Sequence, residues 1–111
     1  MMWWKGARKI FACSEPLDMR KSFRGLIGAV SQVVEADPLS GDAFLFVNRR
    51  QSIVKVLYWD RTGYCIVAKR LERGRFELRG EGVRSELSQQ EAELLLDGIL
   101  LRRRKRKTCN S

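Results

Sequence analysis

The fold is set by the central part of the chain, residues 43–69, which reads AFLFVNRRQSIVKVLYWDRTGYCIVAK. Three runs in it, at 43–47, 53–59 and 64–69, are rich in the β-branched and aromatic residues that favour strands. The polar connections between them, 48–52 and 60–63, are short enough to be hairpin turns. This part of the chain therefore predicts an antiparallel meander of three strands.

The apolar pattern of these runs predicts that both faces of the sheet are partly covered. Residues 44–47 are four consecutive apolar residues, whereas a strand with one face in water would alternate apolar and polar positions. Either helices or another subunit can supply the cover.

Upstream of the meander, residues 9–13 have the composition of a short first strand. Residues 19–36 then predict a long helix, because apolar residues recur at spacings of three and four. These residues are Met19, Phe23, Leu26, Ile27, Val30, Val33 and Val34. Asp18 is placed to cap the helix, which must end before Pro38.

Downstream of the meander we expect a further short strand at 75–79 and then a polar stretch, 80–86. Ser88 and Glu91 have the spacing of a capping box and predict the start of a second helix. Its apolar residues are Ala92, Leu95, Leu96 and Ile99, and it should end near Leu101.

The sequence thus predicts one α+β domain over residues 1–101, since 111 residues suffice for a single domain. It comprises a small antiparallel sheet of three to five strands, a long helix before the sheet and a second helix after it. Residues 102–111 are expected to be a basic, disordered tail.

Positive charge is the strongest compositional feature. The chain has 22 Lys and Arg against 13 Asp and Glu, for a net charge of +9. Most of this excess lies in one run: Arg102, Arg103, Arg104, Lys105, Arg106 and Lys107. We interpret the run as an arm for a polyanion, the alternative being a tail that only keeps the chain in solution.

Several function classes are disfavoured. The chain has no histidine, and its three cysteines form no C-x-x-C pair, so we expect no metal site, no imidazole-based catalytic triad and no cofactor. The spacing of the acidic residues does not require a catalytic metal site, so we predict that the protein is not an enzyme. It has neither a signal peptide nor a membrane span, so we expect it in the cytoplasm, with its cysteines reduced.

Two further groups of basic residues are candidates for DNA binding. Arg20, Lys21 and Arg24 lie within one helical turn, where they either bind phosphates or only solvate the helix. The second group surrounds the predicted hairpins and is interspersed with aromatic residues, a combination that suits phosphates and bases. Its members are Arg49, Arg50, Lys55, Lys69, Arg70, Arg73 and Arg75. The alternative is that they keep the edge of the sheet soluble.

A succession of motifs carries a family resemblance over residues 8–101. In order they are DMRKSFRGL at 18–26, DPLSG at 37–41, FLFVNRR at 44–50, KVLYWD at 55–60, KRLERGRF at 69–76 and LLLDGI at 94–99. The succession resembles the second-reading-frame, TnpB-like accessory proteins of the insertion-sequence sixty-six family of bacterial transposable elements. Ser22 and Leu39 depart from it, standing where the family usually has glycine and phenylalanine.

The resemblance implies an accessory role in transposition, beside a separate and larger transposase that carries the catalytic carboxylates. Combined with the charge, it predicts a non-catalytic protein that binds element DNA, the transposase, or both through basic surface residues. The alternative is a protein interaction module or regulator in the transposition complex that does not bind DNA directly. Homo-oligomerisation is left open.

Overall fold

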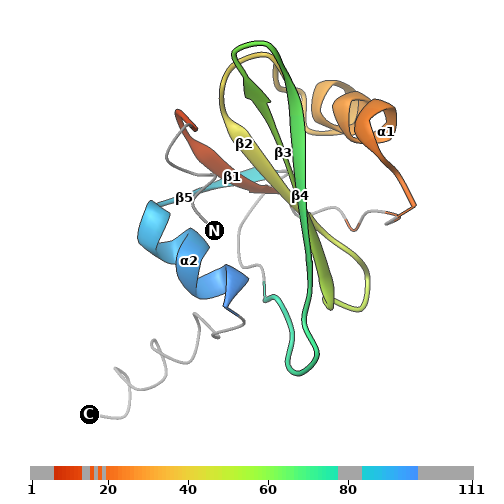
Figure 1. Cartoon of the computed structure of the whole chain (residues 1–111), viewed down its shortest axis with the longest axis vertical. Helices are drawn as coiled ribbons and strands as arrows, with labels where there is room; N and C mark the ends of the chain where they lie inside the picture. Colours follow the sequence, from red (N-terminus) through yellow and green to blue (C-terminus); the bar gives the residue numbers. More distant parts are fainter. Residues whose placement is uncertain (1–6, 14–15, 17, 19, 78–83, 98–111) are drawn as a thin grey trace.

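The computed structural model describes residues 7–13, 16, 18, 20–77 and 84–97, which form a five-stranded sheet with a helical segment on each face (Figure 1). The strands are β1 (Ile10–Cys13), β2 (Ala43–Val47), β3 (Ile53–Asp60), β4 (Gly63–Arg70) and β5 (Arg84–Leu87). Their order across the sheet is β4-β3-β2-β1-β5.

The predicted meander is confirmed. Strands β2, β3 and β4 are antiparallel neighbours, and β2 begins and ends at the residues that the sequence indicates. The register pairs Ala43 with Tyr58 and Val56 with Val67. Asp60 pairs with Gly63 across a two-residue turn, in which Arg61 has a positive φ of 49°.

The predicted antiparallel sheet is wrong, because the sheet is mixed. β1 lies parallel to β2, with Ile10 beside Ala43 and Ala12 beside Leu45, and antiparallel to β5. The parallel pair arises because residues 14–42 carry the chain from the end of β1 back to the start of β2, and they include a helical segment. A connection of this length allows two strands to run in the same direction, which a hairpin cannot do.

The predicted long helix over 19–36 is also wrong. A short helix, α1 (Phe23–Gly28), continues into a π-helical turn, η2 (Ala29–Val33), after which Glu35 takes a positive φ of 57°. Asp18 is not the N-cap, because α1 begins at Phe23 and Ser22 holds the N-cap position. The Asp18 carboxylate instead accepts a hydrogen bond from the Arg20 backbone N–H at 2.9 Å. Such local bonds compete with helix formation, so the helix begins only after Ser22.

The expected strand at 75–79 is wrong for its described part, since residues 75–77 have no regular structure and 78–79 lie outside the described residues. The last strand is β5, which overlaps the stretch 80–86 that was expected to be polar and ends one residue beyond it. Leu87 is the buried residue of β5, and pairing with β1 holds β5 in the sheet. A short, mostly polar edge strand has no hydrophobic alternation to reveal it.

The second helix, α2 (Gln89–Leu96), confirms the predicted capping box. The Ser88 hydroxyl accepts a hydrogen bond from the Glu91 N–H at 3.0 Å, and the Ser88 N–H donates to the Glu91 carboxylate at 2.9 Å. Ile99, Leu101 and the tail 102–111 lie outside the described residues. No helix in the described ranges is long and apolar enough to cross a membrane.

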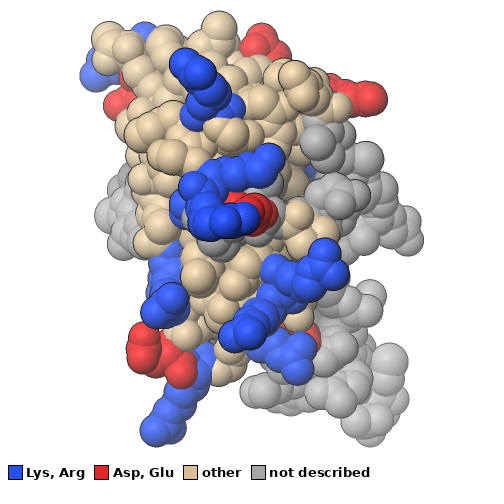
Figure 2. All heavy atoms as spheres, turned by 90° about the vertical axis from the view of Figure 1, so that its right-hand side faces the viewer, with Lys and Arg blue, Asp and Glu red and all other residues tan. Residues whose placement is uncertain are grey.

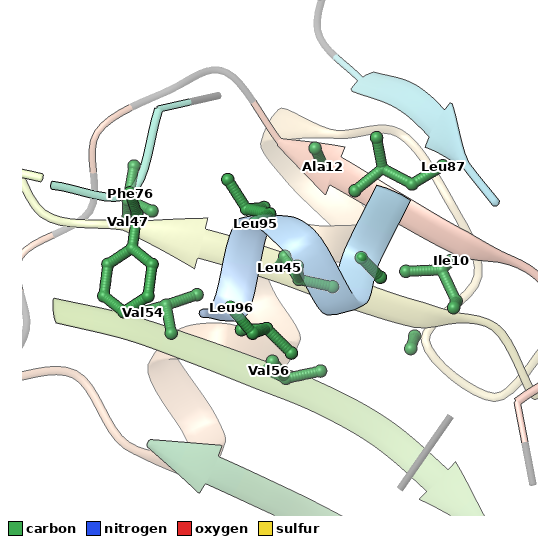
Figure 3. Close-up of a cluster of buried hydrophobic side chains, with 12 residues drawn as sticks. Ile10, Ala12, Leu45, Val47, Val54, Val56, Phe76, Leu87, Leu95 and Leu96 are labelled. Atoms are coloured by element: carbon green, nitrogen blue, oxygen red, sulfur yellow. The ribbon is translucent and has the colours of Figure 1, made fainter. Parts of the chain in front are cut away.

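Both faces of the sheet are partly covered, as the apolar runs predict, and β4 is the least buried of the three meander strands. On one face, α2 packs Leu95 and Leu96 over the sheet, and Phe76 closes the end of the same cluster (Figure 3). On the other face, Leu26 and Val30 of the first helical segment pack with Phe44 and Phe46. The two helical segments supply the cover.

Candidate nucleic-acid interface

Hydrogen bonds hold the turn between β2 and β3, which carries two arginines. The Asn48 side-chain oxygen accepts hydrogen bonds from the N–H groups of Ser52 at 2.8 Å and Ile53 at 3.0 Å. The Gln51 N–H bonds to the Asn48 carbonyl at 3.0 Å, and Gln51 adopts a positive φ of 62°. Arg49 and Arg50, between these anchors, are exposed.

The segment after β4 is held against this turn by three hydrogen bonds. The Leu71 N–H donates to the Ser52 carbonyl at 2.9 Å, and the Phe76 N–H donates to the Gln51 carbonyl at 2.7 Å. The Arg75 guanidinium donates to the Gln51 side chain at 3.3 Å. Five exposed arginines thereby meet at one end of the sheet. We call this group the arginine end: Arg49, Arg50, Arg70, Arg73 and Arg75.

The charges of the arginine end are not neutralised by neighbouring carboxylates. Within the described part of the chain, none of its five members forms an ion pair, although Glu72 and Glu77 lie in the same segment. Figure 2 shows Lys and Arg side chains over the middle and lower part of the face that carries α1 and this end of the sheet. Such charges attract anions from solution.

A second group of cations lies beside α1, joined to the arginine end through the sheet. The Lys55 ammonium donates to the Lys21 carbonyl at 2.8 Å, which holds the segment before α1 on β3. Arg70 pairs with Ile53, two residues from Lys55 on the same face. Residues in this diagonal relation are about 7–8 Å apart, so Lys55 and Arg70 are neighbours on this face of the sheet.

Arg20 and Arg24 differ in how far their charge is available. Arg20 forms an ion pair with Asp18 at 2.7 Å, and this hydrogen-bonded pairing lowers the pKa of Asp18 to about 2. Arg24 is exposed and forms no ion pair with any described residue. Arg24 is therefore more available than Arg20 to bind an anion.

Lys69 does not join the other predicted site residues. It pairs with Val54 on the face that α2 covers, and its ammonium donates to the Leu96 carbonyl at 2.7 Å and lies 3.9 Å from Asp97. Lys69 thus binds the C-terminal end of α2, where a positive charge is favourable. The six predicted tail residues, Arg102 to Lys107, lie outside the described residues.

Gly25 positions this site in a way that the sequence did not indicate. A Cβ atom at this position would lie 2.8 Å from the Lys21 Cβ and 3.0 Å from its Cγ, closer than such atoms approach. The absent side chain lets the Lys21 stem lie against the first turn of α1. In the sequence, the signal that could have revealed this role is a glycine inside the predicted helix.

We predict opposite effects for two glycine substitutions in α1. Gly28→Ala should raise the free energy of unfolding by about 0.5–1 kcal/mol, because alanine favours the helix and a Cβ there has nothing within 4 Å. Gly25→Ala should be about 1–2 kcal/mol less stable than Gly28→Ala, because it displaces Lys21 and its bond from Lys55. Urea unfolding of both variants tests this, and equal stabilisation would contradict it.

The two cysteines in the described part of the chain do not belong to this surface. Cys13 and Cys65 are free, and burial raises the pKa of the Cys13 thiol to about 12, so it stays protonated. Among the residues that the structure describes, no three Cys, Asp or Glu side chains are grouped to hold a metal ion.

Comparisons with known proteins identify the family. The family model described as IS66 Orf2 like protein matches residues 8–106. The uncharacterized protein y4hO of Sinorhizobium fredii is 36% identical over 92 residues, which cover 82% of this chain and 80% of y4hO. The uncharacterized protein y4jC of the same organism is 34% identical over 101 residues, covering 89% and 86% of the two chains. No solved structure matches. The chain belongs to the IS66 Orf2-like family of transposition-associated accessory proteins.

Proposed function

We propose that this chain is a non-catalytic accessory factor that binds DNA during transposition of its insertion sequence. The observation that carries the proposal is the arginine end, where exposed arginines lie together without ion pairs to described carboxylates. Lys21, Arg24 and Lys55 extend this surface along α1 and β3.

The chemistry of these side chains suits phosphates. A guanidinium presents several N–H donors in one plane and can bind two phosphate oxygens at once. Each phosphate neutralised releases condensed counterions, which favours binding without reading sequence. The chain would then supply affinity and orientation, while recognition of the element ends rests with another component of the complex.

A non-catalytic role agrees with how the carboxylates are used. Asp18 pairs with Arg20, and Asp42 pairs with Arg8 at 3.2 Å. Asp60 lies 4.0 Å from Arg61 in the β3–β4 hairpin. Metal-assisted phosphoryl transfer uses carboxylates gathered around one or two ions, so carboxylates that pair separately with arginines support binding rather than cleavage.

The test is a titration of the full chain against a labelled duplex that carries the element end, with a scrambled duplex as control. We expect similar affinity for both duplexes and a fall of about two to three orders of magnitude between 50 and 200 mM salt, as about five phosphate contacts require. If the chain ignores both duplexes at low salt but captures the transposase, the proposal fails in favour of the protein interaction module.

A further inference from the structure

Phe23 is exposed where the sequence predicts burial. Its place in the apolar pattern of residues 19–36 puts it on the buried side of a helix, yet 46% of its surface is open to solvent. Since α1 begins at Phe23, the ring lies at the free end of the helical segment, while Leu26 and Val30 anchor the same segment to the sheet. The ring is an apolar group on a rigid support.

Phe23 lies in the same short segment as two exposed cations. Lys21 and Arg24 flank it along the chain, and both are exposed. Lys21 is held in place on two sides, by the hydrogen bond from Lys55 to its carbonyl and by the close approach of its stem to Gly25. Phe23 therefore lies between two exposed cations in the chain, one of which is anchored to β3.

We propose that Phe23 stacks on an unpaired DNA base, which makes the start of α1 a site for single-stranded or locally opened DNA. The inference rests on the proposed function, since the flanking cations would bind the phosphates on either side of that base. Proteins that bind single strands combine the same two elements, a cationic path for the backbone and an aromatic ring for a base. Phosphate binding alone needs no apolar ring.

Stacking on Phe23 requires DNA in which a base has an uncovered face. In a duplex each base is covered by its neighbours, so a surface ring finds no free base unless the duplex is opened or kinked. An unpaired base offers a free face, and any of the four bases can stack there. We therefore expect the chain to prefer single-stranded or bubble DNA to intact duplex, without a preference for sequence.

The experiment uses single-stranded oligonucleotides that carry one 2-aminopurine, a base whose fluorescence falls when it stacks. Adding the full chain should quench the probe, and Phe23→Ala should abolish the quenching and weaken single-strand binding by about fivefold to a hundredfold. Phe23→Trp should retain both. The matched control is Leu39→Ala, a truncation of another exposed apolar residue (54% exposed), which should change neither.

Duplex binding separates this inference from the one on which it rests. Phe23→Ala should bind intact duplex within about twofold of the unaltered chain, because its cations remain. If the variant binds and quenches single strands like the unaltered chain, the stacking inference is overturned and duplex binding still stands. If the variant loses only capture of the transposase, Phe23 contacts protein and the inference is also overturned. Failure of the unaltered chain on every DNA would instead reject the proposed function.

Discussion

Replacing Arg49, Arg50, Arg73 and Arg75 together with glutamine should reduce the slope of log affinity for duplex DNA against log salt by about 3.6 units. Each arginine that contacts a phosphate accounts for about 0.9 of a unit, because it releases the counterions condensed there. The four residues are exposed on the β2–β3 turn and the segment after β4, so the substitutions remove charge and leave the core intact. Titrations at four or more salt concentrations give the slope.

Arg61 is the matched control for this variant. It is an exposed arginine in the β3–β4 turn, at the other end of these strands from the arginine end, and it lies 4.0 Å from Asp60. Arg61→Gln should leave the slope within a few tenths of a unit. Deletion of residues 102–107 is a second comparison, since it measures the phosphate contacts of the tail separately. An unchanged slope in the quadruple variant would show that the arginine end does not bind the duplex.

Phe76→Ala should lower the free energy of unfolding by about 3–5 kcal/mol, the usual cost of truncating a fully buried phenylalanine. Phe76 is completely buried, although it lies in an irregular segment, and it packs in the cluster beneath α2 (Figure 3). Domains of this size are stable by about 5–15 kcal/mol, so this loss would remove much of the total. Chemical unfolding followed by far-ultraviolet circular dichroism measures it.

The same substitution at Phe23 is the control for stability. Phe23 is 46% exposed, so Phe23→Ala should cost less than about 1 kcal/mol. The two variants remove the same side chain and differ in burial. Equal costs would contradict the assignment of Phe76 to the core. Because Phe76 anchors the segment that carries Arg73 and Arg75, its truncation should also weaken duplex binding under conditions where the variant remains folded.

The local parts of the fold were predictable because their signals are local. The β-branched and aromatic runs of residues 43–69 identify β2, β3 and β4, and their lack of alternation predicts two covered faces. Ser88 and Glu91 mark the start of α2, because a capping box needs residues only three positions apart. The family resemblance also lies in the sequence, and the family match confirms it.

The candidate interface was predictable only in part. The sequence groups Arg49 and Arg50 with the arginines after β4, and the hydrogen bonds to Ser52 and Gln51 bring the two segments together. Lys69 and Arg70 are adjacent in the sequence but lie on opposite faces, because successive residues of a strand alternate. Composition cannot show which of two neighbouring cations faces the open surface.

Hydrophobic pattern, turn chemistry and charge, all short-range properties, were sufficient to place the meander, the start of α2 and the excess of cations. Tertiary structure alone decided that β1 lies parallel to β2, that a polar segment pairs as β5, and that Phe23 remains exposed while Phe76 is buried. Each of these outcomes depends on contacts between residues far apart in the chain. Their free energy arises only when the whole sheet has assembled, so no window of sequence contains it.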